Sequence, residues 1–560
     1  MRPRCRQRKS ETPGEHPNPN TNQRVNRDAF LRQIQESSAV WDLLVIGGGA
    51  TGLGTAVDAA ARGYRTVLVE QSDFAKATSS RSTKLIHGGI RYLRQGDFHL
   101  VRESLRERAR LLQNAPHLVC PLPFIVPNYA WWEGPYYGAG LKLYDLLAGK
   151  FRLNSSAHIT REQVLKHAPT LQPDRLRGGI RYFDGQFDDA RLAVCLAQTL
   201  ADLGGLPVNY LRVESLLKES GRVRGAITRD LETGQSYEIP ARAVVNATGV
   251  FTDTIRRMDD PQAPDAIMAS QGAHVVLDRS FLPGDSAVLI PRTDDDRVLF
   301  AIPWQDRTLV GTTDTSARET ALEPRPTRAE IEFLLQHAGR YLRQKPVARD
   351  VLSAFAGLRP LVKTNGERNT ARLSRDHALL VSPSGLTSVA GGKWTTYRQM
   401  GEDTVNLAAR AAGLPTRPSR TGKLQLHGWT AEFDATSHWR VYGADRPRLL
   451  ALLRENPGWN EPLHPRLPYC AGEVIWAVRH EMARTVEDTL SRRTRALMLD
   501  ARASAQIAPK VAALMAGELG RDEQWIKEQV NAFQTLADGY LPRAGDNGVL
   551  PRSHPTVPPR

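Results

Sequence analysis

Residues 42–70 read DLLVIGGGATGLGTAVDAAARGYRTVLVE, and this stretch decides the fold. An apolar strand, a glycine turn, a helix of small residues and a second apolar strand follow one another, as in a βαβ unit. Gly47 makes the turn, Gly49 lets the backbone approach a pyrophosphate, and Gly52 allows helix and strand to pack closely. Glu70 ends the second strand, where a carboxylate accepts hydrogen bonds from a ribose. The stretch therefore predicts a dinucleotide-binding, Rossmann-like domain.

The bulk composition is that of a globular protein of several domains. The chain has 560 residues, of which 41% are hydrophobic and 24% charged, so we expect three or four domains at ~150 residues each. The four cysteines are scattered and form no C-x-x-C pair, which predicts neither a disulfide framework nor a metal site. No apolar run reaches the ~20 residues that a membrane-spanning helix needs.

The net charge of +15 favours an anionic partner, such as a phosphorylated substrate, an acidic membrane surface or nucleic acid. Residues 1–40 are rich in Arg, Pro, Asn and Gln and lack the apolar core of a secretory signal, so we expect a disordered basic arm. This arm also lacks the aromatic residues of a nucleic-acid-binding segment, so no nucleic-acid partner is expected. Residues 542–560 predict a loose tail.

Three further segments have the composition of a cofactor site. Thr78, Ser79 and Ser82 supply hydroxyl groups suited to phosphate and ribose contacts. Thr248-Gly249 follows a predicted strand and offers a second close approach of the backbone. Gly391-Gly392 precedes a predicted helix whose N-terminal dipole would stabilise negative charge on a reduced flavin ring. The hydroxyl of Thr395 either caps this helix or contacts the flavin. One glycine motif joined to such distant segments favours FAD over NAD.

Eight runs occur in the order typical of one enzyme family. They are the opening stretch (42–70), ATSSRSTKLIHGGIRYL (77–93), DDARL (188–192), VVNATG (244–249), IPWQDRTLVGTTDT (302–315), AGLRPL (356–361), SRDHALLVS (374–382) and GGKWTTYRQM (391–400). In these runs the chain resembles the bacterial FAD-dependent glycerol-3-phosphate dehydrogenases over about residues 41–400. Its helical C-terminal region is similar to the cap domain of that family more loosely.

The resemblance implies an α/β fold with three parts. A Rossmann-like FAD-binding domain comprises residues 41–125, 186–270 and 350–405. An antiparallel-sheet substrate-binding domain, residues 126–185 and 271–349, is inserted into it. Residues 406–541 form a C-terminal helical cap domain.

The resemblance also implies roles for particular residues in oxidising sn-glycerol 3-phosphate to dihydroxyacetone phosphate. Arg91, Arg359 and Arg375 match the motif positions for binding the phosphate, since a guanidinium binds phosphate oxygens bidentately, with Tyr92 beside them. Lys393 would stabilise the reduced flavin and the substrate oxygen. His274 and His87 are candidates for the base that removes the hydroxyl proton, with His274 slightly favoured. Either histidine could instead be a core residue bonded to the backbone.

The resemblance implies a membrane quinone as electron acceptor and a cytoplasmic enzyme attached peripherally to the inner face of the membrane. Residues 136–152 interleave aromatic and aliphatic residues with lysine and arginine, a composition that suits an anionic membrane surface or, equally, a half-buried packing helix. An oxidase that reduces oxygen, or an amine or amino-acid oxidase of the same fold, are the alternatives. The sequence leaves open whether the chain forms a homodimer.

Overall fold

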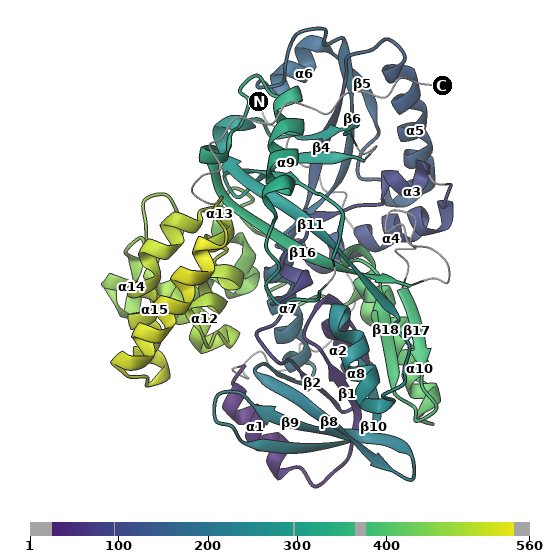
Figure 1. The fold of residues 1–560 in the computed structure, drawn as a ribbon, viewed down its shortest axis with the longest axis vertical. Coiled ribbons are helices and arrows are strands. Elements are labelled where there is room, and N and C mark those ends of the chain that lie inside the picture. Colours follow the sequence, from purple (N-terminus) through teal and green to yellow (C-terminus); the bar gives the residue numbers. More distant parts are fainter. Residues whose placement is uncertain (1–24, 95, 295–296, 318, 364–376, 543–560) are drawn as a thin grey trace.

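The computed structural model describes residues 25–94, 96–294, 297–317, 319–363 and 377–542 (Figure 1). Within them, eight strands form a first sheet with the order β17-β18-β10-β1-β2-β7, extended by β8 and β9. Parallel pairing joins β1 to β2 and β10, β10 to β18, and β2 to β7. This confirms the Rossmann-like sheet. Its strands are β1 (Trp41–Ile46), β2 (Thr66–Val69), β7 (Leu206–Val208), β8 (Leu211–Glu219), β9 (Arg222–Asp230), β10 (Ser236–Asn246), β17 (His377–Val381) and β18 (Thr387–Gly391).

The described residues also form a second, largely antiparallel sheet of ten strands, which confirms the inserted antiparallel sheet. Its longest pairing joins β11 to β16, and Figure 1 shows these two strands running together through the centre of the molecule. The strands are β3 (Leu85–Ile86), β4 (Val119–Asn128), β5 (Ala157–Thr160), β6 (Gly178–Phe187), β11 (Ile267–Asp278), β12 (Ala287–Ile290), β13 (Leu299–Trp304), β14 (Arg307–Gly311), β15 (Thr315–Ser316) and β16 (Val351–Val362).

The second sheet corrects the expected domain boundaries. Strands β3, β16 and most of β4 were expected in the FAD-binding domain, but all three pair within the second sheet. The partner of β16 lies about eighty residues earlier in the chain, and a buried strand carries no local signal of which distant strand it pairs with.

Helices cover both sheets and form the C-terminal region. Those on the sheets are α1 (Arg27–Glu36), α2 (Ala50–Ala61), α3 (Ile90–Arg94), α4 (Phe98–Asn114), α5 (Glu133–Ala148), α6 (Arg161–His167), α7 (Asp189–Asp202), α8 (Thr252–Asp259), α9 (Arg328–Tyr341) and α10 (Tyr397–Ala411). The C-terminal helices are α11 (Arg446–Glu455), α12 (Ala471–Glu481), α13 (Ala496–Leu499), α14 (Ala501–Leu519) and α15 (Glu523–Asp538).

Helix α2 crosses α10 where two glycines meet. A Cβ atom built on Gly401 would lie 2.6 Å from the carbonyl carbon of Gly54, and one on Gly54 would lie 2.8 Å from the carbonyl oxygen of Tyr397. The missing side chains let the two helices approach closely. This contact places the start of α10, which follows the predicted cofactor segment 391–395, beside the glycine turn that begins α2.

The disordered arm predicted for residues 1–40 is wrong for its second part. Residues 27–36 form helix α1, which buries Phe30, Leu31 and Ile34. Arg27 pairs with Asp230 at 2.5 Å, and both side chains are buried. The abundant Arg and Asn hid this amphipathic helix, whose buried Arg27 finds its partner about two hundred positions away. Residues 1–24 lie outside the described part of the chain, as does most of the predicted tail, residues 543–560.

The C-terminal region is helical, as expected. Its helix α12 ends at Glu481, because Met482 takes a left-handed conformation (φ 52°). A π-helical turn (Asp488–Arg493) then directs Arg492 and Arg493 onto Asp73, which lies just after β2. Among the described helices, none has the length and apolarity needed to cross a bilayer.

Candidate active site

A cavity of about 1920 Å³ has walls from both sheets. Sixteen of the residues predicted for the site line it: Gly47, Gly49, Glu70, Thr78, Ser79, Ser82, His87, Tyr92, Thr248, Gly249, His274, Arg359, Gly391, Gly392, Lys393 and Thr395. The fold therefore brings together segments that are more than three hundred residues apart in the chain. Arg375 lies outside the described residues. Arg91 lies in α3, where the structure describes its backbone only.

The glycine turn fits a pyrophosphate. Gly47 has a φ of +111°, and a Cβ there would lie 2.6 Å from the carbonyl oxygen of Ala247. Gly52 packs tightly under the turn, since its Cβ would come within 1.8 Å of the carbonyl oxygen of Gly47. Gly49 is the N-cap of α2 and has no side chain between the first-turn amides and the cavity. These amides and the helix dipole suit an anion, so the turn can hold the diphosphate of FAD.

Glu70 holds the turn in shape. Its carboxylate accepts hydrogen bonds from the backbone N–H of Gly48 at 2.6 Å and of Ser72 at 2.9 Å. Burial raises the pKa of this carboxyl group, although the two backbone donors oppose the shift. Each carboxylate oxygen has a second lone pair, so the side chain can also accept a hydrogen bond from a ribose at the cavity wall.

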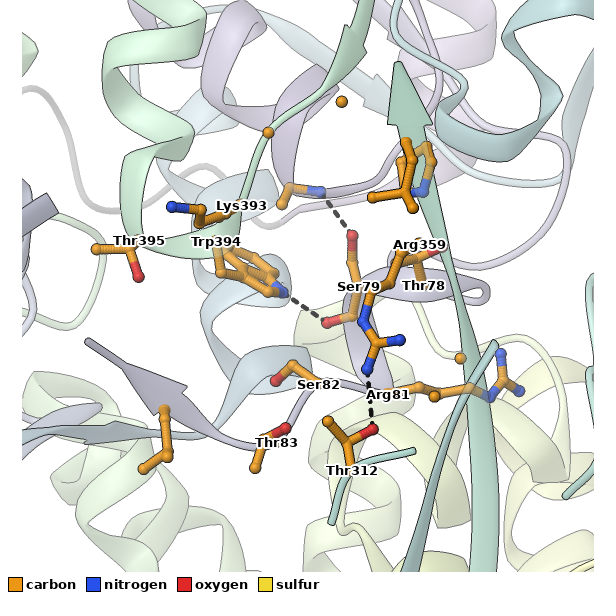
Figure 2. A pocket seen from close by; sticks show the side chains of 18 of the residues that line it. Thr78, Ser79, Arg81, Ser82, Thr83, Thr312, Arg359, Lys393, Trp394 and Thr395 are labelled. Atoms are coloured by element: carbon orange, nitrogen blue, oxygen red, sulfur yellow. Dashed lines mark hydrogen bonds between the residues drawn. The ribbon is translucent and has the colours of Figure 1, made fainter. Parts of the chain in front are cut away.

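The predicted hydroxyl groups of residues 78–82 bond mainly to the protein. Thr78 Oγ1 donates to the carbonyl oxygen of Leu358 at 2.6 Å, and Ser82 Oγ donates to Asp189 at 2.7 Å. Ser79 Oγ accepts from the backbone N–H of Ala50 at 2.9 Å, which joins this segment to the first turn of α2. Trp394 Nε1 donates to the carbonyl oxygen of Ser79 at 2.9 Å, as Figure 2 shows. These bonds fix the wall of the cavity.

A cluster of buried ion pairs supports the segment 78–82 on the side away from the cavity. Asp189 pairs with Lys84 at 2.7 Å and with Arg495 of the helical domain at 2.9 Å. Burial opposes ionisation of Asp189, but the two cations outweigh it and hold its pKa below the usual value. Arg495 also donates to the carbonyl oxygen of Ser80 at 3.0 Å. The run 188–191 thus has a structural role, and Arg191 pairs likewise with Glu481 at 2.6 Å.

His274 lies in β11 between two cross-strand neighbours. Its ring stacks on Phe355 at 4.9 Å and fills the space that a side chain at Gly311 would need. Nε2 bonds to the hydroxyl of Thr83 at 2.9 Å, whereas Nδ1 is buried with no hydrogen-bond partner among the described residues. Burial, with the charges of Lys84 and Arg359, lowers the pKa of His274 well below its usual value. The ring is therefore neutral. Because a buried N–H without an acceptor is rarely tolerated, the proton is assigned to Nε2, which donates to Thr83.

His87 and Lys393 also line the cavity. The backbone N–H of His87 donates to Thr395 Oγ1 at 3.3 Å, which ties the motif around residue 87 to the loop before α10. The side chain of His87 lines the cavity. Lys393 Nζ lies 3.7 Å from the centre of the Tyr92 ring, a cation–π contact that keeps a positive charge at the cavity wall.

Arg359 reaches the cavity from β16. Its Nη2 donates to Thr312 Oγ1 at 2.9 Å (Figure 2) and to the carbonyl oxygen of Thr313 at 3.0 Å. Its Nη1 lies 3.7 Å from the carboxylate of Asp314. The predicted phosphate ligand is thus at the cavity and held in a fixed orientation.

Sequence reasoning missed several residues of the cavity wall: Thr83, Arg297, Thr312, Asp314 and Trp394. All except Arg297 lie inside runs that carried the resemblance, so their position in those runs was the available signal. Arg297 follows a polar turn and had no such signal. Among the described residues, no group of three or more His, Cys, Asp or Glu side chains is arranged to hold a metal ion.

Comparisons with known proteins agree with this architecture. Residues 42–398 match the family model "FAD dependent oxidoreductase", and residues 393–526 match "C-terminal domain of alpha-glycerophosphate oxidase". The mitochondrial glycerol-3-phosphate dehydrogenase of Homo sapiens is 42% identical, with 93% of this chain and 77% of the relative aligned. That of Schizosaccharomyces pombe is 37% identical over 89% of this chain and 87% of the relative.

Solved structures give the same result. The glycerol-3-phosphate dehydrogenase from Bacillus halodurans, complexed with FAD, superposes with a TM-score of 0.76 and 31% identity, covering 92% of this chain and 98% of that one. The L-alpha-glycerophosphate oxidase from Mycoplasma pneumoniae shares the fold, with a TM-score of 0.54, 18% identity, and coverage of 69% of this chain and 98% of that one. The similar proteins include mitochondrial enzymes as well as a bacterial one. The comparisons therefore show the family, but they do not confirm the expected resemblance to its bacterial members in particular. The cofactor is FAD, and the chain belongs to the family of FAD-dependent glycerol-3-phosphate dehydrogenases.

Proposed function

We propose that the protein oxidises sn-glycerol 3-phosphate to dihydroxyacetone phosphate, with hydride transfer from C2 to N5 of FAD and delivery of the electrons to a membrane quinone. The observation that carries the proposal is the guanidinium of Arg359 in the cavity wall, oriented by Thr312 and Thr313. A fixed guanidinium suits a phosphate dianion because it offers paired N–H donors and a permanent charge. Bound FAD supplies the two-electron acceptor.

The protein's own residues bind the substrate and manage its proton. Arg359 binds the phosphate, and Lys393 stabilises negative charge that develops on the C2 oxygen. His87 lines the cavity and takes the C2 hydroxyl proton. His274 has a different role. Its Nε2–H donates a hydrogen bond to the Thr83 hydroxyl, so its ring positions that hydroxyl at the cavity. The slight initial preference for His274 as base is therefore replaced by a preference for His87.

Exposed apolar side chains in and beside helix α5 support a quinone as the electron acceptor. Trp131, just before the helix, is 76% exposed, and Leu146 within it is 75% exposed. Tyr136 and Leu143 of the helix are exposed and also line the cavity. Exposed aromatic and aliphatic side chains at an interface suit insertion into the edge of a bilayer. Because the same helix lines the cavity, an apolar acceptor can pass from the lipid to the site. We propose a peripheral enzyme on the inner face of the membrane, held also by its net charge of +15 on anionic lipid.

Anaerobic titration of the purified protein tests the substrate. We expect sn-glycerol 3-phosphate to bleach the flavin absorbance and equimolar glycerol to leave it unchanged. Equal bleaching by glycerol, or none by the phosphate ester, would contradict the proposal. Peroxide formation measured against quinone reduction separates a dehydrogenase from an oxidase of the same fold.

Sedimentation with anionic liposomes tests the membrane proposal. The wild-type protein should pellet and be released by high salt, and Leu146→Asp should weaken pelleting without changing flavin content. Leu231→Asp, at an exposed leucine in the turn after β9, is the matched control. Wild-type protein that stays in the supernatant would leave the membrane proposal without support.

A further inference from the structure

In one wall of the cavity, two guanidinium groups each form a salt bridge with a different oxygen of one carboxylate. Asp314 Oδ1 lies 3.7 Å from Nη1 of Arg359, and Asp314 Oδ2 lies 3.8 Å from Nη1 of Arg297. Arg297 Nη1 also donates to the carbonyl oxygen of Asp314 at 2.6 Å. Ser270 donates to the same carboxylate. Two arginines and one aspartate leave this wall, which we call the arginine pair, with a net positive charge.

The three charged side chains differ in exposure. The Asp314 side chain is 3% exposed, whereas those of Arg297 and Arg359 are 22% and 21% exposed, and all three line the cavity. The carboxylate therefore lies beneath the two guanidinium groups, and each guanidinium has part of its surface at the cavity. A buried carboxylate in this position orients the donors and does not close the site.

Thr293 holds the backbone of Arg297 at the cavity. Thr293 Oγ1 accepts from the backbone N–H of Arg297 at 3.0 Å and donates to its carbonyl oxygen at 2.9 Å. Asp294, next to Thr293, is held in turn by Arg340 of α9, which forms a bidentate pair with it at 2.5 and 2.7 Å. The backbone of Arg297 is thus placed before any ligand binds, which lowers the entropy cost of using its side chain.

We propose that Arg297 is a further phosphate ligand, that Arg297 and Arg359 bind the phosphate together, and that Asp314 is the positioning residue for both. The inference rests on the proposed function, since it assigns a further residue to the substrate of that site. One guanidinium neutralises half of a dianion, and a second one supplies the other charge together with further N–H donors. The phosphate ester would then be preferred over an uncharged polyol because both arginines contribute only when the dianion is present.

Anaerobic stopped-flow reduction of the holoenzyme tests the proposal. In Arg297→Gln, we expect the half-saturating concentration of sn-glycerol 3-phosphate to rise about tenfold to a hundredfold, the loss expected for one charge-assisted contact. The limiting rate of flavin reduction should stay within about twofold of wild type, because the reacting carbon is not touched. Arg297→Lys, which keeps the charge but not the fork, should recover part of the loss. Asp314→Asn should raise the half-saturating concentration as well.

Arg340→Gln is the matched control. It removes an arginine that holds Asp294, next to Thr293, from outside the cavity, so an effect caused by loosening of this support would appear in both variants. A wild-type half-saturating concentration in Arg297→Gln, or an equal rise in Arg340→Gln, overturns the proposal.

Binding of inorganic phosphate separates this inference from the proposed function. The dissociation constant can be followed by flavin fluorescence in the oxidised holoenzyme, with no turnover required. Weaker phosphate binding in Arg297→Gln, but not in Arg340→Gln, supports the arginine pair even if sn-glycerol 3-phosphate fails to reduce the flavin. Unchanged phosphate binding in Arg297→Gln contradicts the pair even if the wild-type enzyme oxidises the ester.

Discussion

The guanidinium of Arg359 occupies the space that a side chain at Gly272 would fill. A Cβ on Gly272 would lie 2.2 Å from Nη2 of Arg359 and 2.6 Å from Oγ1 of Thr312. The two residues lie on the neighbouring strands β11 and β16. A glycine in the middle of a long strand is unfavourable for the strand itself, so its presence here has a local reason. It lets an arginine from one strand lie flat across the next.

Gly272→Ala should therefore displace the Arg359 guanidinium and weaken phosphate binding. We expect the half-saturating concentration of sn-glycerol 3-phosphate to rise about tenfold, with the flavin content unchanged, as measured by stopped-flow reduction and the absorbance spectrum. Gly140→Ala is the matched control, since Gly140 also lines the cavity but a Cβ there meets nothing within 4 Å. If the half-saturating concentration is the same in the two variants, Gly272 does not make room for the Arg359 guanidinium.

Gly52→Ala should abolish FAD binding. Its Cβ would overlap the carbonyl oxygen of Gly47 at 1.8 Å, a contact that only movement of the turn can relieve. The ratio of flavin to protein absorbance measures the loss, and we expect less than about a tenth of wild-type occupancy. Gly517→Ala, a helical glycine whose Cβ meets nothing within 4 Å, should keep full occupancy and stabilise α14 by about 0.5–1 kcal/mol. Full occupancy in Gly52→Ala would show that the turn is not the cofactor cradle.

The two histidines should give different kinetic signatures. His87→Ala should slow flavin reduction at saturating substrate at least about tenfold, because it removes the general base. His274→Ala and Thr83→Val should have smaller effects of similar size, and the double variant should be no slower than the slower single one, since both break the same contact. If His274→Ala is far slower than Thr83→Val, His274 is itself the base and the assignment to His87 is wrong.

His427 gives a pH-dependent contribution to stability. Its two ring nitrogens bond to Asp202 and Asp445, each at 2.7 Å, and join α7 to the segment before α11. Burial disfavours the charged ring, but the two carboxylates outweigh it and raise the pKa of His427 to about 10 from an ordinary 6.5. Because the folded-state pKa is the higher one, the stabilisation is complete below about pH 6.5 and is lost as the pH rises through about 10.

His427→Gln should accordingly lower the free energy of unfolding by about 2–4 kcal/mol at pH 6 and by much less at pH 10. Urea unfolding at the two pH values measures the difference. His464→Gln, which loses surface hydrogen bonds to Gln506 and to the backbone N–H of Arg466, is the matched control for replacing a histidine. A loss that is the same at both pH values would mean that His427 is neutral in the folded protein.

The sequence predicted the parts of the site whose geometry is local. The turn at Gly47, Gly49 and Gly52 follows from the conformational demands on a short segment, and the structure has it as expected. What could not be predicted depends on pairing between distant strands. The contact of Arg359 with Thr312 and Asp314 requires β16 and β14 to flank β11, and no residue in these strands specifies that order locally.

Polar side chains were also harder to interpret than glycines. The hydroxyl groups of Thr78 and Ser82 were expected to contact FAD, and in the structure both donate to the protein. The sequence shows that a donor is present but not which of several nearby acceptors it meets. The wrong prediction of a disordered arm over α1 has a related cause, since Arg27 finds its partner Asp230 only in the folded chain.

The hydrogen bond from Arg495 to the carbonyl oxygen of Ser80 has a consequence for how the protein is assembled. The helical domain, although it follows all the motifs predicted to bind FAD, holds the backbone of a segment whose neighbouring residues line the cavity. The domain is thus part of the support of the cavity wall. A chain cut between α10 and α11 would be expected to bind no FAD and to be colourless, and yellow colour in a refolding sample would report that the last quarter of the polypeptide has docked.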